Sequence, residues 1–343
     1  MSTTSAPRVA SLSELRALLN DLPEPDEQAR ARALERDAVL TKPPGALGRL
    51  EEIAAFMAAW QGRHPPAVDH VKVVVFAANH GVAAQGVSAF PAEVTAQMVA
   101  NFKAGGAAIN QLCAAFGHEL EVIPLMELRP GGDISREDAM REQDMLAAIN
   151  AGMAAVGDGT HLLCLGEMGI ANTTVASALL HALFGDTAAD WVGPGTGLNE
   201  QGMRHKAAVV ATAVQRVAGE SDPLRLLQRL GGYEFAALAG AIIGARLARV
   251  PVLLDGFMTA AAAAVLHQVN PDALAHCLAG HVSAEPAHAR ALERLGLTPL
   301  LNLNMRLGEG TGAALAAQLV KAAIATHNGM ATFADAGVSG KQR

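Results

Sequence analysis

Five short apolar runs separated by helical stretches constrain the fold of this 343-residue chain most strongly. The runs are VKVVVFAAN, ELEVIPL, THLLCLGE, PVLLDGF and PLLNLNM, which begin at residues 71, 119, 160, 251 and 299. Each has the length of a strand and is rich in β-branched residues or Leu without alternating with polar residues, as strands buried on both faces are. The pattern predicts an α/β fold with a doubly wound, mostly parallel sheet, in which the last run is a strand that leads to Glu309.

Two helices are predicted before the first of these runs. DEQARARALERDAVL at 26–40 is a charged helix with an acidic first turn, and TKPPGALGRLEEIAAFMAAW restarts as a second helix. Neither has a strand beside it in sequence. We therefore expect a small helical domain over 1–65, joined by the C-terminal segment 326–343, and a large α/β domain over 66–325.

The composition favours a small-molecule ligand over a macromolecular or membrane partner. The formal net charge is −7 and basic residues do not cluster, which argues against nucleic acid. No run approaches the roughly 20 apolar residues that a membrane span needs, and the N-terminus lacks a basic start followed by an apolar segment, so we expect a cytoplasmic protein. Cys113, Cys164 and Cys277 lie far apart in apolar segments, which predicts core residues rather than disulfides or a metal site.

Loops rich in Gly and polar residues follow the predicted strands. In doubly wound sheets, ligands bind beyond the carboxyl ends of the strands, so these loops are the candidate site. GEMGIANTT places backbone N–H groups and the hydroxyls of Thr173 and Thr174 at a helix start, which suits a phosphate. The alternative is that Asn172 or Thr173 only caps a helix that begins at Val175.

The GPGTG loop and the lysine after it allow two interpretations each. The loop contains Gly193, Gly195 and Gly197, but it lacks the GxGxxG spacing of a dinucleotide site, so a tight turn is an equal alternative. Lys206 lies near the start of the following helix, where an ammonium group would pair with a carboxylate or a phosphate. A solvated surface lysine is the alternative.

The segment GHVSAEPAH suggests a metal site or the active site of a Ser/His/Glu hydrolase, because it contains His281, Ser283, Glu285 and His288. The spacing is not a helical HxxxH pair, no Cys or Asp completes a ligand set, and the chain has no GxSxG elbow. A turn with Ser283 at a helix N-terminus, able to hold an anionic oxygen, explains the same residues more simply.

Glu309 is the strongest candidate for a catalytic acid or base. Gly308 and Gly310 surround its carboxylate with little bulk and permit unusual backbone dihedrals. The alternative is that Glu309 only complements the dipole of a helix over 311–325. His80 follows the first strand run and is a second possible base, although a His in such a position is more often a structural hydrogen-bonding group.

Eight motifs, taken in order, resemble one enzyme family over roughly residues 10–325. They are KPPGALGRLE, GVSAFPAEVTAQMVANF, GEMGIANTT, GPGTGL, LGGYEFAALAGAI, PVLLDGF, GHVSAEPAH and MRLGEGTGAALA. In this order and spacing they resemble the nicotinate-nucleotide–dimethylbenzimidazole phosphoribosyltransferases. The resemblance implies a homodimer with a large Rossmann-like domain and a small helical one.

The resemblance also implies the reaction. Such an enzyme transfers the 5-phosphoribosyl group of nicotinate mononucleotide to a benzimidazole nitrogen in the cobalamin pathway, giving α-ribazole 5′-phosphate and nicotinate. No cofactor is implied. No magnesium site is expected either, because phosphoribosyltransferases with a pyrophosphate donor use a pair of acids at a strand end and LLDGF offers one acid.

The family's site residues transfer to matching positions of this chain. The base is the Glu of the LGEG motif, here Glu309. The phosphoribosyl and nicotinate site matches Glu167, Gly169, Asn172, Thr173, Thr174, Gly193, Gly195, Gly197, Lys206, Ser283, Glu285 and Gly308. The benzimidazole pocket matches Phe90, Gln97, Met98, Met168, Met305 and Leu307.

Two positions depart from the family pattern. Phe90 stands where the family has Tyr, which affects the expected base preference, and Ala287 stands where it has Gly. Two other function classes compete with the transferase. A non-catalytic nucleotide- or corrinoid-precursor-binding protein would use the same loops without reaction. An NAD-dependent oxidoreductase would rest on GPGTG alone, without the strand, GxGxxG and helix unit of such enzymes.

Overall fold

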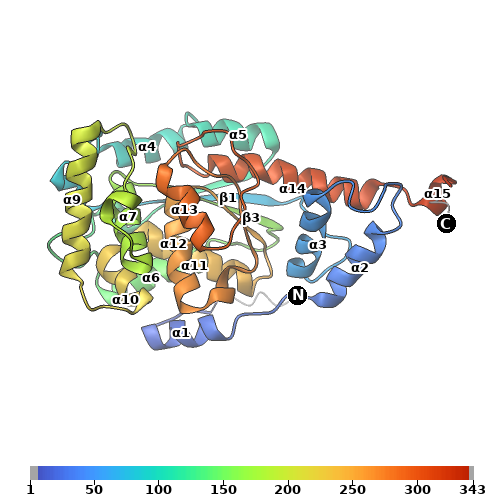
Figure 1. Cartoon of the computed structure of the whole chain (residues 1–343), viewed down its shortest axis with the longest axis horizontal. Helices are drawn as coiled ribbons and strands as arrows, with labels where there is room; N and C mark the ends of the chain where they lie inside the picture. The colour runs from blue at the N-terminus through green and yellow to red at the C-terminus, as the bar shows by residue number, and fades with distance from the viewer. Residues whose placement is uncertain (1–6, 340–343) are drawn as a thin grey trace.

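A five-stranded parallel sheet lies at the centre of the computed structural model, which describes residues 7–339 (Figure 1). Its strands are β1 (Val71–Ala77), β2 (Glu119–Pro124), β3 (Leu162–Met168), β4 (Val252–Leu254) and β5 (Cys277–Ala279). The strand order is β2-β1-β3-β4-β5, and every neighbouring pair is parallel. The predicted α/β fold with a parallel sheet is therefore confirmed, and four of the five predicted strand runs contain a strand.

The predicted strand over 299–305 is wrong. Leu301 forms only an isolated bridge with His281, and the exposed side chain of Leu303 shows that the segment is not buried between layers. Its backbone instead follows the chain beyond β5, where Leu301 donates to the Gly280 carbonyl and Ala284 donates to the Met305 carbonyl. The fifth strand, β5, consists of three residues that the sequence did not identify.

Helices cover both faces of the sheet, which explains why the runs of β1, β3 and β4 do not alternate. The expected burial on both faces is wrong for β2, because it is an edge strand with exposed or half-buried residues. Val74 and Phe76 face one layer, whereas Val73 and Val75 face the other. The first layer contains α6 (Glu142–Ala154), α7 (Asn172–Phe184), α11 (Tyr233–Leu247) and α12 (Phe257–Val269). The second contains α3 (Arg49–Gln61), α5 (Ala108–Phe116) and α14 (Thr311–Gly329).

The remaining helices lie around this three-layer centre. They are α1 (Leu12–Asn20), α2 (Glu27–Asp37), α4 (Val94–Lys103), α8 (Ala188–Trp191), α9 (Glu200–Arg216), α10 (Pro223–Leu230), α13 (Pro286–Arg294) and α15 (Phe333–Ala336). Short 3₁₀ turns span Gly81–Gln85, Met126–Leu128 and Pro271–Leu274. Within residues 7–339, no helix combines the length and the apolar character needed to cross a membrane.

The two helices predicted before the first strand are present as α2 and α3. They lie beside the C-terminal half of α14 at one end of the molecule, near α15 (Figure 1). Arg36 of α2 fixes this arrangement because its guanidinium donates to the carbonyls of His327, Asn328 and Met330. By contrast, α1 packs against α12 and places Leu15 in the main core. The division of the chain at residue 65 stays a prediction, and residues 1–6 and 340–343 of the predicted small domain lie outside the described residues.

Two glycines allow α6 and α11 to pack backbone against backbone. A Cβ added at Gly152 would overlap the carbonyl oxygen of Ala237, and a Cβ added at Gly240 would overlap the carbonyl oxygen of Ile149. Main-chain atoms on both sides cannot move away as a flexible side chain would. The close packing of α6 on α11, which supports the sheet, therefore requires glycine at these two positions.

We predict that Gly240→Ala lowers the free energy of unfolding by about 1–3 kcal/mol, because the added methyl group overpacks the α6–α11 contact. Gly329→Ala is the matched control, since a Cβ at the last residue of α14 meets no atom within 4 Å. The midpoint of chemical denaturation should fall for the first variant and stay or rise slightly for the second. Equal midpoints for Gly240→Ala and the unaltered protein would contradict this account of the packing.

Candidate active site

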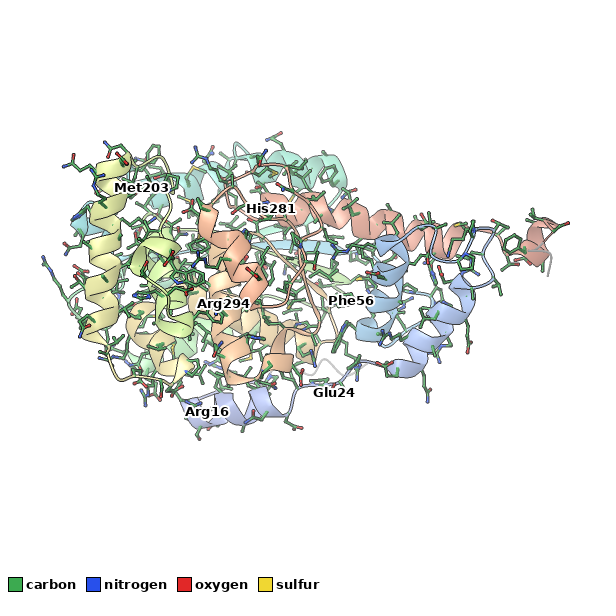
Figure 2. The ribbon with its side chains drawn as sticks, viewed as in Figure 1. Arg16, Glu24, Phe56, Met203, His281 and Arg294 are labelled. Atoms are coloured by element: carbon green, nitrogen blue, oxygen red, sulfur yellow. The ribbon has the colours of Figure 1, made fainter. Side chains whose placement is uncertain are left out.

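A cleft opens at the carboxyl ends of β3, β4 and β5, where several of the predicted loops meet. His281, labelled in Figure 2, marks its position near the starts of α13 and α14. The residues that line the cleft are Glu167, Met168, Gly169, Ile170, Asn172, Thr173, Gly195, Thr196, Gly256, Phe257, Met258, His281, Ser283, Glu285, Arg306, Leu307 and Gly308. The cleft therefore lies at the carboxyl ends of the strands, which is the sheet edge where the sequence predicts a site.

Ten of the site residues predicted from the sequence line the cleft directly. The structure brings together Glu167, Met168, Gly169, Asn172, Thr173, Gly195, Ser283, Glu285, Leu307 and Gly308. The others, which do not line it, are Phe90, Gln97, Met98, Thr174, Gly193, Gly197, Lys206, Met305 and Glu309. Among these, Thr174 is fully buried, and its hydroxyl has no hydrogen-bond partner in the part of the chain that the structure describes.

Sequence reasoning missed six residues of the cleft wall. They are Ile170, Thr196, Gly256, Phe257, Met258 and Arg306. Gly256, Phe257 and Met258 follow β4 almost directly, so the sheet-edge rule that selected the other loops also points to them.

Helix α7 begins at the cleft with Asn172, three residues earlier than the sequence suggested. No side chain caps its N-terminus, and Ala171 precedes it in the left-handed conformation with φ 74°. The interpretation that Asn172 or Thr173 serves only as a cap is therefore wrong. Both side chains face the cleft, at the positive end of the helix dipole, where an anion is favoured.

Lys206 of α9 is fully buried, so the interpretation of a solvated surface lysine is wrong. Its Nζ lies 2.7 Å from Thr173 Oγ1 and 3.3 Å from the Gly193 carbonyl oxygen. An ammonium group only donates, so Thr173 Oγ1 accepts this bond and its own proton stays available to a ligand in the cleft. Burial lowers the pKa of Lys206 to about 8, although Glu285 opposes that shift.

The GPGTG loop forms the wall above this lysine. A Cβ added at Gly195 would lie 3.0 Å from Thr173 Oγ1 and 3.5 Å from Lys206 Nζ. The loop follows α8 rather than a strand, so it does not have the context of a dinucleotide fingerprint. Its role in the cleft is a close backbone approach over Thr173.

Ser283 is held by the buried imidazole of His288. The Ser283 backbone N–H donates to His288 Nδ1 at 2.9 Å, which makes that nitrogen an acceptor. The Ser283 hydroxyl, 3.0 Å from the same nitrogen, therefore donates to it as well. Burial lowers the pKa of His288 to about 3, so the ring is neutral. Within residues 7–339, no group of three His, Cys, Asp or Glu side chains has a geometry that would hold a metal ion.

Two buried carboxyl groups face the cleft with raised pKa values. Burial raises the pKa of Glu285, against the effects of Lys206, the Gly195 N–H and Arg306. Burial raises the pKa of Glu167 further, and neighbouring acids, above all Asp255, add to the shift. The Asn172 amide donates to Glu167. A Cβ at Gly308 would lie 2.5 Å from Glu167 Oε1, and the φ of 83° at Gly308 is one that residues with a Cβ rarely adopt, so a larger residue there would be strained.

Glu309 lies directly behind the cleft wall, in a run of three left-handed residues. Gly308, Glu309 and Gly310 have φ values of 83°, 63° and 82°. Gly310 is the N-cap of α14, so Glu309 is not the cap of that helix. Its carboxyl group instead interacts with the backbone N–H of Ile109 at the start of α5, and its Oε2 has no hydrogen-bond partner among residues 7–339.

The environment of Glu309 suits a base. Burial raises the pKa of the Glu309 carboxyl group above its ordinary value, the charge of Asp255 adds to this, and the Ile109 N–H opposes it. His80, the other candidate base, is buried against Glu234, with His80 Nε2 2.5 Å from Glu234 Oε1. His80 therefore has the structural hydrogen-bonding role that was the preferred interpretation of its position in the sequence.

Of the predicted benzimidazole residues, Gln97 and Met98 lie on α4 and Phe90 lies in the loop before it. Met168 is the last residue of β3, and Met305 and Leu307 lie in the segment before α14. Thr95 of α4 accepts a hydrogen bond from the Ile170 N–H at 3.1 Å, which holds α4 against the loop after β3. Met98 and Met168 pack against the same core cluster. Phe90 and Leu307 are 50% and 58% exposed, so they present apolar surface at this end of the sheet.

Comparison with known proteins relates the chain to one enzyme family. A family model described as phosphoribosyltransferase matches residues 22–338. The nicotinate-nucleotide–dimethylbenzimidazole phosphoribosyltransferase of Rhizobium etli (strain CIAT 652) is 59% identical over 329 residues, covering 96% of this chain and 97% of that protein. The enzyme of the same name from Rhizobium rhizogenes (strain K84) is 57% identical and covers 99% of this chain and 100% of its own length. The crystal structure of CobT from Thermus thermophilus superposes with a TM-score of 0.86 at 43% identity, covering 92% of this chain and 100% of that chain.

We predict that a sugar phosphate binds more weakly when Lys206 loses its proton. Because burial lowers the Lys206 pKa to about 8, affinity for ribose 5-phosphate should fall as the pH rises through that value. The phosphate monoester itself is fully ionised above about pH 7 and contributes no change there. Calorimetry should show that the affinity for ribose 5-phosphate falls about tenfold, which corresponds to the loss of one charge-assisted hydrogen bond. Lys206→Met should bind weakly at every pH; a pH-dependent affinity that persists in this variant would assign the effect to another group.

Proposed function

This chain belongs to the nicotinate-nucleotide–dimethylbenzimidazole phosphoribosyltransferase family, and we propose that Glu309 is the general base of the transfer that it catalyses. The reaction moves the 5-phosphoribosyl group of nicotinate mononucleotide to 5,6-dimethylbenzimidazole in cobalamin synthesis. The products are α-ribazole 5′-phosphate and nicotinate. The observation that carries the proposal is the buried Glu309 carboxyl group, with one unpartnered oxygen, directly behind Gly308 of the cleft wall.

One base is sufficient for this chemistry. The ring nitrogen of nicotinate mononucleotide is already cationic, so nicotinate leaves as a neutral pyridine and needs no general acid. The attacking benzimidazole loses its N–H proton as, or after, its other nitrogen bonds to the ribose C1. The Glu309 carboxylate accepts that proton and, as an anion, stabilises the positive charge that develops on the reacting groups.

We assign the phosphate to the amino end of α7. Asn172 and Thr173 face the cleft there, and the Thr173 hydroxyl is oriented as a donor by Lys206. These groups offer hydrogen bonds and one positive charge to a phosphate monoester. Ser283 and Glu285 also line the cleft, and the contacts of Glu285 with Gly193 and the Gly195 N–H place it beside the loop over Thr173, where these two residues are available to the ribose hydroxyls.

We assign the acceptor base to the space between Glu309 and α4. Phe90, Gln97, Met98, Met168, Met305 and Leu307 are the proposed contacts, as the family resemblance implies. Support comes from the hydrogen bond between Thr95 and Ile170, because it holds α4 beside the loop that follows Met168. The homodimer and the cytoplasmic location belong to the proposal as well. The exposed Leu303 and Leu307 are apolar side chains that a second chain would cover, which supports the homodimer.

We predict that the protein releases nicotinate from nicotinate mononucleotide when dimethylbenzimidazole is present, even with a strong chelator. The donor carries a phosphate monoester and a cationic leaving group, so no pyrophosphate has to be neutralised by a metal ion. Chromatographic detection of nicotinate and α-ribazole 5′-phosphate in equal amounts checks this. Absence of both products from folded protein that binds the nucleotide would contradict the proposed function.

We predict that Glu309→Gln lowers kcat by about 10²- to 10⁴-fold, the usual worth of a positioned general base. Nucleotide affinity should change little, because Glu309 does not line the cleft. In the unaltered enzyme, kcat should fall with decreasing pH through a pKa above the ordinary 4.5 of a Glu carboxyl, since only the ionised form accepts a proton.

Glu293→Gln serves as the matched control, because Glu293 is an exposed carboxylate on α13. Steady-state kinetics across pH should show the unaltered profile for Glu293→Gln. Normal turnover by Glu309→Gln would mean that another group is the base.

A further inference from the structure

We infer that Asp255 is a positioning residue: it binds the amino end of α14 and thereby holds Glu309 in its reactive orientation. The inference rests on the proposed role of Glu309 as the base. Asp255 follows β4 directly, is 1% exposed and does not line the cleft. It therefore acts on the reaction through the backbone of the turn that carries Glu309, and not through contact with a substrate.

The Asp255 carboxylate takes the place of a cap on α14. The Gly310 N–H donates to Asp255 Oδ2 at 3.2 Å, and the Ala313 N–H donates to Oδ1 at 2.9 Å. The Gly312 N–H interacts with the same carboxyl group. No side chain of the helix itself caps this end, so N–H groups that would lack partners are satisfied by a residue from the sheet.

The turn needs such an anchor because its backbone is unfavourable. A left-handed conformation costs a residue with a Cβ roughly 1–2 kcal/mol, and Glu309 adopts it without the freedom of its glycine neighbours. On the other side the turn presses on β3, where a Cβ at Gly166 would lie 2.5 Å from the Gly310 nitrogen. Glu309 is thus fixed between a close backbone contact and the hydrogen bonds of Asp255.

Among the described residues, the groups around Asp255 do not include a compensating cation. The titratable neighbours are Glu167 and Cys164 of β3, Glu309 in the turn, and His281 beyond β5, whose Nε2 lies 3.6 Å from Asp255 Oδ1. Burial lowers the pKa of His281, so the ring is neutral near pH 7. Burial raises the pKa of Asp255 to about 7, against the effect of the three N–H groups. The backbone N–H groups at the start of α14 therefore stabilise the negative charge of Asp255.

We predict that Asp255→Asn lowers kcat by about 10- to 100-fold, as displacement of a reacting group by about 1 Å does. An Asn side chain has the same shape, but its NH₂ group faces N–H donors and cannot accept from them. The KM for nicotinate mononucleotide should stay within about twofold, because the cleft residues are unchanged.

The pH dependence gives a readout that a purely structural role would not change. In the unaltered enzyme, the charge of Asp255 raises the pKa of Glu309 and so moves the fall of kcat at low pH toward higher pH. Removal of the carboxylate abolishes this effect, so the acid limb of Asp255→Asn should move to lower pH. Glu234→Gln is the matched control, because it removes another fully buried carboxylate without contact to α14, and its acid limb should not move.

Hydrogen exchange tests the anchor directly. Peptides covering 308–316 should exchange faster in Asp255→Asn than in the unaltered protein, whereas peptides covering β2 should not change. If Asp255→Asn does not fold, Asp255→Ser is the second variant, since its hydroxyl still accepts one N–H while the charge is lost. The same kinetic and exchange changes are expected.

The outcomes separate this inference from the proposed function. Suppose that the unaltered enzyme turns over and that Glu309→Gln loses activity. If a folded Asp255 variant then keeps the kcat, the acid limb and the hydrogen exchange of the unaltered enzyme, the inference about Asp255 is overturned and the proposed function is not. Loss of thermal stability with unchanged kcat and acid limb would also overturn it. Absence of transfer by the unaltered enzyme would overturn the proposed function instead.

Discussion

The left-handed turn at Gly308, Glu309 and Gly310 is the constraint on which the candidate active site depends. It lets the chain leave the cleft wall, press against β3 at Gly166 and enter α14 within three residues. Glycine meets the first and last of these conformations at little cost, whereas Glu309 adopts its own only because the surroundings hold it there. A carboxylate is thereby buried beside the cleft and directed toward the first turn of α5.

The parallel sheet supplies what that turn requires. The strands end at the same edge, so Glu167 at the end of β3 and Asp255 after β4 lie close to one another and to Glu309 although they are far apart in sequence. Mutual repulsion and burial then favour protonated or hydrogen-bonded carboxyl groups over free charges. Backbone N–H groups of α14 and the Asn172 amide donate hydrogen bonds to these acids, and the charge of the buried Lys206 favours the ionised form of Glu285.

The sequence predicted the sheet and the loops better than the details of the site. Apolar runs identified β1 to β4. β4 and β5 both have three residues, but β4 lies in the longer apolar run PVLLDGF, whereas His276 and Gly280 flank β5 directly, so no run marks it. The run at 299–305 has apolar residues of the right kind, yet the exposed Leu303 shows that no second layer covers it. Gly and hydroxyl residues after strands identified the cleft, because the edge of a parallel sheet can be inferred from strand order alone. The burial of Lys206 beneath Gly195 and the contact of Glu309 with Ile109 depend on helices that approach from elsewhere in the chain, and no local pattern encodes them.

A crystal structure of the protein with dimethylbenzimidazole and nicotinate bound tests the central claim most directly. If Glu309 is the base, one nitrogen of the benzimidazole will lie within about 3.2 Å of a Glu309 carboxylate oxygen, and the other will face the position of the ribose C1. The nicotinate nitrogen should have no acidic side chain within the same distance. A benzimidazole bound in the cleft with both nitrogens away from Glu309, whose carboxylate remains on the Ile109 amide, would contradict the account.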